Sequence, residues 1–312
     1  MRDEGEEIKL RSHELTEAVE SLARSGTSAE SQRGFSKTPL FVANNAARYQ
    51  RQQLIQAIEA RTHRTLLCYI GGNEAEIERD DTVGFVDLLH NIGKDSKIDL
   101  VIHTIGGDID VAEKLITLVQ ARVGGPQNIR AIVPDFAKSA GTLMALGADS
   151  ILMSDSSELG PIDPQVMLKD AHGNEICHSV FAYLAVYRVH EGALRKNDTD
   201  PVAAMMLGKF DPAIVQKFQV IGDRARVVAE NLLKRRGMPF SKIASHLLDV
   251  GLHKSHNQMI TAQDAHEFGL KIEMIDQADP LWEDIWQLHC LQRLSIDDKQ
   301  KLFESLHVSL PM

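Results

Sequence analysis

The sequence predicts an α/β protein built on parallel strands. Short runs of β-branched and aliphatic residues, typical of buried strands, alternate with amphipathic helical segments across short loops. Two of the strand–helix junctions, at residues 104–108 and 137–141, carry unusual turns. Because sites in α/β structures gather at the carboxyl ends of strands, we expect these two junctions to form a site together.

Composition limits the classes of protein that are expected. The chain has 312 residues, of which 43% are hydrophobic and 25% are charged, as in an ordinary globular domain with or without appendages. A net charge of −10 argues against broad nucleic-acid binding. No run is long enough for a transmembrane helix, so nothing supports membrane association and a cytoplasmic protein is expected. The three separated cysteines indicate a reducing compartment and no metal motif: Cys68, Cys177 and Cys290.

The spacing of apolar residues predicts the helices and strands in the first half of the chain. Residues 1–37 are charged and Ser-rich, and are expected to be a flexible N-terminal segment. Helical spacing is found at residues 44–61 and 81–92. Strand patterns are found at residues 65–70, 98–104, 129–133 and 150–153.

The first unusual turn follows the strand at residues 98–104. It reads Ile-Gly-Gly-Asp at 105–108 and opens an amphipathic helix that Asp108 or Asp110 can cap. Paired glycines such as Gly106 and Gly107 let the backbone approach another group closely with free N–H groups. The alternative is a tight turn alone, and no third glycine completes a dinucleotide fingerprint.

The second unusual turn places Ser139 at the first turn of a helix. Pro134 ends the preceding strand, and Lys-Ser-Ala-Gly follows at 138–141. Unpaired N–H groups and the positive end of the helix dipole can stabilise an oxyanion there, which favours a nucleophile. The alternative is that Ser139 is only an N-cap, a common role for serine.

The second half is predicted to be mainly helical. Helices are expected at residues 177–190 and 213–236, at 242–248 with Ser241 as its cap, and in two amphipathic stretches between residues 280 and 312. The domain organisation predicted is a flexible segment at 1–37, a main domain at 38–276 and a helical extension at 277–312.

Four motifs in order resemble the serine dehydrogenase proteinase family. They are His-Thr-Ile-Gly-Gly-Asp at 103–108, Ala-Lys-Ser-Ala-Gly-Thr-Leu-Met-Ala-Leu-Gly-Ala-Asp at 137–149, Glu-Leu-Gly-Pro-Ile-Asp-Pro-Gln at 158–165, and the segment 255–270. That family belongs with the Clp proteolytic subunit, signal peptide peptidase A and crotonase. The resemblance covers roughly residues 64–276. It implies a spiral of β-β-α units with added helices at both ends, a homo-oligomer and no cofactor.

The resemblance also implies a site. The Clp proteolytic subunit carries its catalytic histidine near the position where this chain has Asp163, which is a departure. His256 matches a histidine in the corresponding loop of the family. The hypothesis is that Ser139 attacks, His256 accepts its proton and Asp163 orients His256. The oxyanion hole would then be Gly106 or Gly107 with the N–H of Ala140.

Other roles for these residues stay open. Asp163 can instead shape a Pro-flanked turn, and His256 can be a loop histidine bound to backbone. A zinc site at His253 and His256 lacks a third ligand nearby. A lysine base, as in signal peptide peptidases, has three candidates beyond the serine, none in a clearly apolar run: Lys169, Lys196 and Lys209. A fourth candidate, Lys138, directly precedes Ser139 and is expected to point away from it, although it could line the mouth of the site.

The function predicted is a serine peptidase that acts on peptides or unfolded protein through an acyl-enzyme on Ser139. One alternative is a crotonase-like acyl-thioester enzyme that uses the oxyanion hole without the serine. Another is a non-catalytic oligomeric scaffold with the same fold. Nothing in the residues indicates dehydrogenase chemistry, a substrate, an activator or the oligomer size.

Overall fold

The computed structural model describes residues 37–169, 172–237, 239–249, 251–253 and 255–312. The chain separates into two units, Met1–Tyr49 and Gln50–Met312. In the first unit, helix α2 (Pro39–Asn44) begins at Thr38, whose hydroxyl accepts a hydrogen bond from the Phe41 N–H. Helix α3 (Ala46–Thr62) starts in this unit and continues into the second. Almost all of the predicted flexible segment, residues 1–37, lies outside the described residues.

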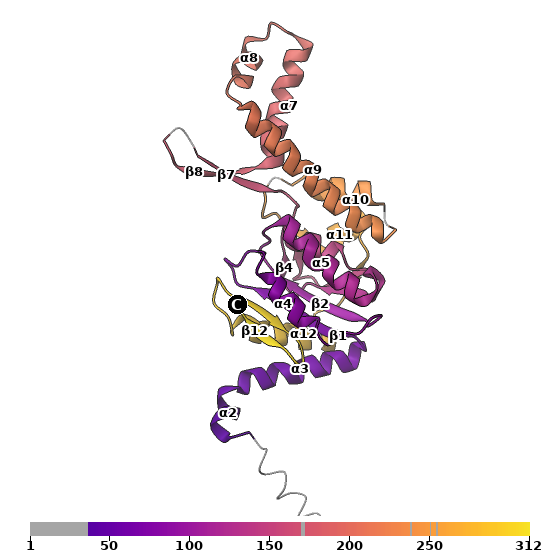
Figure 1. Cartoon of the computed structure of the whole chain (residues 1–312). Coiled ribbons are helices and arrows are strands. Elements are labelled where there is room, and N and C mark those ends of the chain that lie inside the picture. The colour runs from indigo at the N-terminus through magenta and orange to yellow at the C-terminus, as the bar shows by residue number, and fades with distance from the viewer. Residues whose placement is uncertain (1–36, 170–171, 238, 250, 254) are drawn as a thin grey trace, which may run out of the picture. The chain divides into compact units, whose positions relative to one another are not determined.

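The second unit is built on a seven-stranded sheet with the order β10-β5-β3-β2-β1-β11-β12 (Figure 1). The first five strands in this order run parallel to one another, β11 pairs antiparallel with β1, and β12 pairs antiparallel with β11. The bounds are β1 (Thr65–Gly71), β2 (Ile98–His103), β3 (Ile129–Ile132), β5 (Ser150–Met153), β10 (Ile272–Met274), β11 (Lys301–Glu304) and β12 (Ser309–Pro311). The strands predicted at residues 65–70, 98–104, 129–133 and 150–153 are confirmed.

Helices cover both faces of this sheet because successive strand residues point to opposite sides. Leu67 and Tyr69 belong to a core shared with α4 (Asp81–Leu88), α5 (Ile109–Val123) and α6 (Ala140–Leu146). Leu66, Cys68 and Ile70 belong to a second core, shared with α3 and α12 (Pro280–Arg293). The continuous apolar run of β1 is therefore buried on both faces, as in other parallel sheets.

A second, short sheet gives the fold its spiral character. It has the order β4-β6-β9, with β4 (Phe136–Ala137), β6 (Glu158–Leu159) and β9 (Ile260–Thr261). Strand β3 is followed by β4 and then α6, so a long strand, a short strand and a helix form one repeating unit. This arrangement is the predicted α/β fold of β-β-α units.

Residues 165–247 add a hairpin and four helices, and α7, α9 and β7 share a small core of their own (Figure 1). The elements are β7 (Gln165–Lys169), β8 (Glu175–Ser179), α7 (Val180–Lys196), α8 (Pro201–Leu207), α9 (Pro212–Arg235) and α10 (Phe240–Leu247). The helix predicted from residue 177 begins three residues later, because Cys177 pairs with Met167 in the hairpin. Ser241 does not cap α10, whose N-cap position is Pro239. Among the described residues, no helix combines the length and apolar character needed to cross a membrane.

Of the two helices predicted at the C-terminal end, the first is confirmed and the second is wrong. After α11 (Ala262–Phe268), helix α12 forms as expected, but no second helix follows: Leu302 and Phe303 lie in β11, which pairs with β12. Leu302 packs with the α3 and α12 core, whereas the next residue, Phe303, packs against Tyr69 and Phe85 on the other face. Successive residues that point to opposite faces are typical of a strand. The neighbouring apolar residues are spaced as in a helix, so the sequence did not indicate this strand.

Candidate active site

Ser139 occupies a strained turn between β4 and α6. It stands at the N-cap position of α6 with φ 49° and ψ −113°, and its side chain makes no capping hydrogen bond. The simple N-cap alternative is therefore wrong. A non-glycine residue in such a conformation costs about 1–3 kcal/mol and is held only by its surroundings. The turn leaves the hydroxyl free for chemistry at the positive end of a helix.

Neighbouring contacts hold this turn in place. The Lys138 N–H donates to the Thr104 carbonyl at 3.0 Å, and the Gly141 N–H donates to the Lys138 carbonyl at 2.7 Å. Thr142 Oγ1 accepts from the Gly160 N–H at 3.1 Å. The first bond joins the Ser139 turn to the end of β2, so the two predicted strand–helix junctions form one structure.

The glycine pair lies directly against Ser139. Gly106 has φ 105°, and a Cβ atom on it would stand 2.9 Å from the Ser139 Cβ. The Gly106 N–H donates to Thr104 Oγ1 at 3.1 Å and is therefore occupied. No described residue accepts a hydrogen bond from the N–H of Gly107 or from that of Ala140 at the start of α6. Of the predicted oxyanion-hole donors, Gly107 and Ala140 are thus the free pair.

His256 and Asp163 face each other across the same site. His256 Nδ1 lies 3.6 Å from Asp163 Oδ2, longer than a hydrogen bond but within the looser range of unliganded sites. Asp163 is 5% exposed, and its Oδ1 accepts a hydrogen bond from Ser179 Oγ at 2.7 Å. The Ile162 N–H anchors the Asp163 loop to the Leu247 carbonyl at 2.8 Å.

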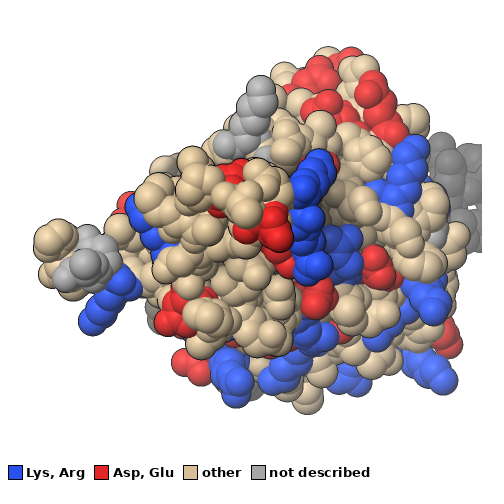
Figure 2. Space-filling view, turned by 90° about the horizontal axis from the view of Figure 1, so that it is seen from above, with Lys and Arg blue, Asp and Glu red and all other residues tan. Residues whose placement is uncertain are grey.

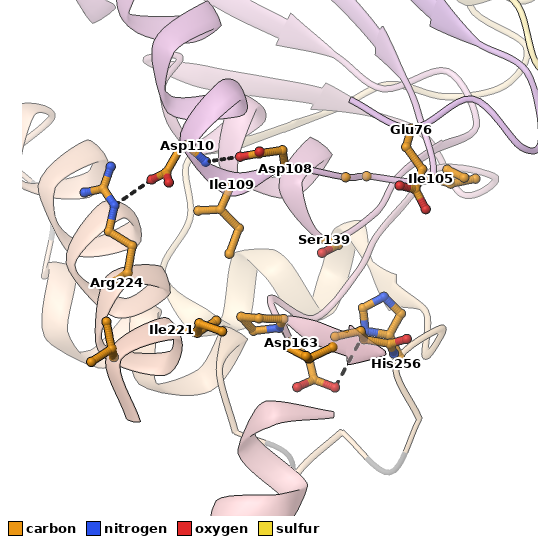
Figure 3. A pocket seen from close by; sticks show the side chains of 16 residues that line it. Glu76, Ile105, Asp108, Ile109, Asp110, Ser139, Asp163, Ile221, Arg224 and His256 are labelled. Atoms are coloured by element: carbon orange, nitrogen blue, oxygen red, sulfur yellow. Dashed lines mark hydrogen bonds and ion pairs between the residues drawn. The ribbon is translucent and has the colours of Figure 1, made fainter. Parts of the chain in front are cut away.

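These residues share one pocket of about 620 Å³ (Figure 3). Its lining includes all predicted site residues except Ala140: Gly106, Gly107, Ser139, Asp163 and His256. Arg224 of α9 also lines the pocket, with its Nε 2.7 Å from Asp110 Oδ1 on α5. The remaining charged lining residues are acidic: Glu76 and Asp108. The pocket therefore joins a nucleophile, an imidazole–carboxylate pair and free N–H donors in an acidic surrounding.

The four lysines proposed as alternative bases lie elsewhere. Lys138 is buried, and its Nζ is 3.0 Å from Glu158 Oε1 rather than directed into the pocket. The other three are exposed and do not line the pocket: Lys169, Lys196 and Lys209. His253 is buried with Nε2 2.7 Å from the His246 carbonyl, which accounts for it without zinc.

Sequence reasoning missed Ser179 and Thr104. Ser179 holds the carboxylate of Asp163 and also caps α7, and Thr104 occupies the Gly106 N–H. Thr104 lies inside the first motif, so its position was a usable signal. Ser179 had none, since the structure brings it to Asp163 through a hairpin that the sequence did not predict.

The fold and the Ser139 turn define the class: an α/β protein with the Clp-protease-like arrangement of β-β-α units. Residues 50–181 match the family described as ClpP-like SDH-type serine proteinase. The resemblance found in the motifs is thereby confirmed.

Curated relatives of the chain include two uncharacterised proteins of Methanocaldococcus jannaschii. MJ0137 is 33% identical over 195 residues, which are 62% of this chain and 59% of the relative. MJ1495 is 40% identical over 73 residues, which are 23% of this chain and 24% of the relative. The chain therefore spans about three fifths of the first relative and about a quarter of the second.

Solved structures with some likeness include two variants of the membrane-bound stomatin-specific protease 1510-N. The first aligns with a TM-score of 0.42 and 14% identity over 71% of this chain and 84% of that chain. The second, in complex with a substrate peptide, aligns with a TM-score of 0.40 and 14% identity over 68% and 75%. Likeness this distant supports no statement about mechanism.

Proposed function

We propose that this protein is a serine peptidase that cleaves peptides or unfolded protein through an acyl-enzyme on Ser139. The observation that carries the proposal is the Ser139 turn, where an uncapped hydroxyl lies in one pocket with the His256–Asp163 pair and the Gly107 N–H. The matching family of serine proteinases gives independent support.

The proposed mechanism assigns one task to each group. His256, oriented by Asp163 at Nδ1, takes the Ser139 proton on Nε2 as Oγ attacks the peptide carbonyl. The N–H groups of Gly107 and Ala140 stabilise the oxyanion, and His256 returns the proton to the leaving amine. Water then hydrolyses the acyl-enzyme by the same route. Ser179 holds Asp163 in place and acts as a positioning residue.

Assembly and location belong to the same proposal. We expect a cytoplasmic homo-oligomer, and the family match supports the assembly. Among the described residues no disulfide joins the cysteines, which is consistent with a reducing compartment. Sedimentation velocity on the full chain tests the assembly, and a purely monomeric protein at working concentration would contradict it.

The deciding experiment is intact mass spectrometry after incubation with a fluorophosphonate. Wild type should gain one adduct, and Ser139→Ala should gain none. Ser241→Ala, which removes an exposed serine of α10 outside the pocket, is the matched control and should label like wild type. His256→Ala should slow labelling by at least about a hundredfold, as loss of a general base does.

Other outcomes point to other functions. Full labelling of His256→Ala would remove the histidine base, and Lys138→Ala would then be tested. Absence of any adduct on folded wild type would contradict the peptidase proposal. Turnover of an acyl-thioester that survives Ser139→Ala would favour the crotonase-like alternative, and no turnover of either substrate would favour a scaffold.

A further inference from the structure

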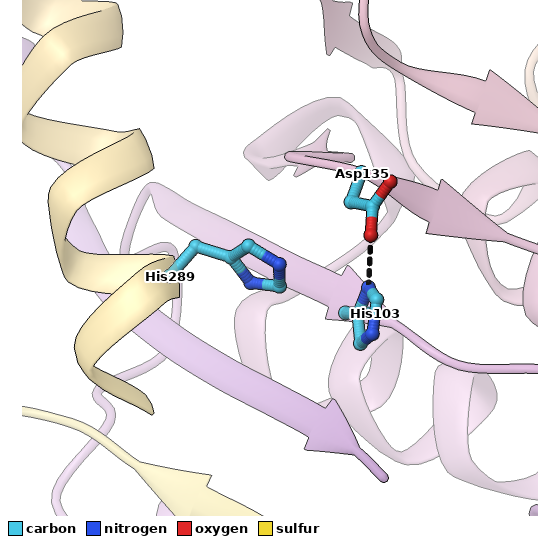
Figure 4. Close-up of side chains that lie close together, drawn as sticks. All are labelled: His103, Asp135 and His289. Atoms are coloured by element: carbon cyan, nitrogen blue, oxygen red, sulfur yellow. Dashed lines mark ion pairs between the residues drawn. The ribbon is translucent and has the colours of Figure 1, made fainter. Parts of the chain in front are cut away.

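A second group of chemically active side chains lies outside the Ser139 pocket. His103 ends β2, Asp135 lies between β3 and β4, and His289 comes from α12 (Figure 4). Their ligand atoms all lie within 4.8 Å of one another. His103 Nδ1 is 3.8 Å from Asp135 Oδ2, and the two imidazole rings are 4.6 Å apart between centroids. None of the three lines the Ser139 pocket.

The two histidines are buried with nitrogens that lack partners. His103 is 1% exposed, and neither Nδ1 nor Nε2 has a hydrogen-bond partner among the described residues. His289 is 4% exposed, and its Nδ1 also has none. A buried polar atom without a partner costs about 1–3 kcal/mol, so three such atoms in one place need an explanation.

Burial disfavours the charged form of both imidazoles. Burial, reinforced by neighbouring charges, lowers the pKa of His103 to about 2, and burial together with Arg293 lowers that of His289 to about 4. The positive charge of Arg293 opposes the binding of a metal cation here. Its guanidinium donates hydrogen bonds to the Gly71 carbonyl at 2.7 Å and to Asn73 Oδ1 at 2.8 Å.

The ligand set fits zinc chemistry. Two imidazole nitrogens and one carboxylate oxygen are the protein ligands of many open zinc sites. Bonds of about 2.0–2.1 Å in a tetrahedral site place ligand atoms roughly 3.3 Å apart, so the His103–Asp135 pair needs to close by about half an ångström. The Asp135 side chain is 41% exposed and provides a route from solvent.

We propose that His103, Asp135 and His289 bind one divalent transition-metal ion of the zinc type. The ion would satisfy the buried nitrogens and cross-link α12 to the ends of β2 and β3. His103 directly precedes Thr104, whose hydroxyl accepts from the Gly106 N–H, so the metal would also fix the turn beside Ser139. The ligands come from three distant parts of the chain, so no sequence spacing indicated the site.

Cobalt(II) titration of the full chain, freed of metal with EDTA and dialysed, tests this site. Wild type should show a visible d–d spectrum of four- or five-coordinate cobalt that saturates at one ion per chain. A thiolate charge-transfer band should be absent, because no cysteine belongs to the ligand set. Asp135→Asn and His289→Asn should lose this spectrum, while the control His90→Gln, at an exposed histidine, should keep it.

Folding is followed in the same samples. Near-UV circular dichroism should be unchanged in Asp135→Asn, whose side chain is partly exposed, and zinc should raise the thermal midpoint of wild type but not of this variant. No one-to-one spectrum in folded wild type, or an equal spectrum in Asp135→Asn and His289→Asn, would overturn the proposal. The readout is independent of peptidase activity.

Discussion

Gly106 and Ser139 show how closely two strand–helix turns approach at the site. A Cβ atom on Gly106 would lie 2.8 Å from the Lys138 carbonyl oxygen and 2.9 Å from the Ser139 Cβ. Gly106 also has φ 105°, a backbone conformation that residues with a Cβ atom rarely adopt. The approach brings the free N–H of Gly107 to the side of the nucleophile, so glycine at position 106 is a requirement of the proposed oxyanion hole.

Gly106→Ala should therefore damage both folding and the site. We expect a loss of unfolding free energy of at least about 2 kcal/mol, from backbone strain together with the collision, and no phosphonate labelling of Ser139. Urea denaturation and intact mass measure the two effects.

Gly173→Ala is the matched control for this prediction. Gly173 has φ 85°, but a Cβ there meets nothing within 4 Å, so only backbone strain remains. Equal losses of stability in the two variants would mean that the contact with Ser139 contributes nothing.

Much of the candidate site was predictable at this scale. Ser139, Asp163 and His256 were selected from motifs, and the structure places all three in one pocket. The strain at Ser139 and the occupied Gly106 N–H were not predictable, because both depend on the neighbouring turn rather than on local sequence. The catalytic roles themselves stay a proposal.

Among the elements, β11 is tied to the rest of the protein by a buried ion pair. Arg51 of α3 contacts Glu304 with Nε 3.0 Å from Oε1, and the two side chains are 6% and 0% exposed. Gln292 Nε2 of α12 donates to the same carboxylate at 2.9 Å. Glu304 therefore joins α3, α12 and β11 on one side of the sheet.

Glu304→Ala should destabilise the protein by roughly 3–5 kcal/mol, because it leaves the buried Arg51 charge without its partner. Guanidinium denaturation measures this loss. Lys299→Ala is the control, since its pair with Glu74 spans 3.8 Å between side chains that are 82% and 63% exposed. It should leave stability unchanged, and a similar loss in both variants would contradict the special role of Glu304.

Glu273 lies in β10, at the opposite edge of the seven-stranded sheet from β11 and β12, and predicts how stability depends on pH. Burial raises the pKa of Glu273, but hydrogen bonds from Ser150 and Arg130 outweigh burial and leave the pKa below its ordinary value of 4.5. The unfolded chain then binds the proton more readily than the folded one. The stabilisation is complete above pH 4.5 and is lost as pH falls through the lower, folded-state pKa.

Glu273→Gln should remove this part of the acid sensitivity. Between about pH 5 and about pH 3, the unfolding free energy of wild type should fall more steeply than that of the variant. Urea denaturation across this range measures both slopes. Parallel curves would show that the ion pair with Arg130 does not affect stability.

The elements that sequence reasoning missed share a physical cause. The hairpin at Gln165–Ser179 is largely exposed, so its strands carry no clear apolar alternation. Strand β11 is buried on all four residues, but only Leu302 and Phe303 are apolar, and two apolar residues do not distinguish a strand from a helix. Four of the five parallel strands, β1, β2, β3 and β5, were predicted because each is a short run rich in β-branched and aliphatic residues.

At the scale of the whole molecule, both the chain and the lining of the pocket are negatively charged. The chain carries −10, and Figure 2 shows Lys and Arg side chains interspersed with Asp and Glu on the visible face. Glu76, Asp108 and Asp110 line the pocket, with Arg224 as the opposing charge. On the proposed function, basic peptides should thus be attracted more strongly than acidic ones.

Salt should weaken this preference. Raising sodium chloride from about 0.05 M to about 0.5 M should lower kcat/KM severalfold for a basic peptide and raise it for an acidic peptide of equal length. Initial rates with two fluorogenic peptides measure the effect. Salt responses of the same direction and size for both peptides would exclude electrostatic selection by the pocket.

The antiparallel pairing of β11 with β1 has a consequence for synthesis on the ribosome. Strand β1 emerges early, but its outer neighbour follows only after everything from β2 to α12 has been translated. An unpaired edge of buried, apolar residues is a template for aggregation. The interval between these two strands is therefore a period in which the nascent chain is prone to aggregation.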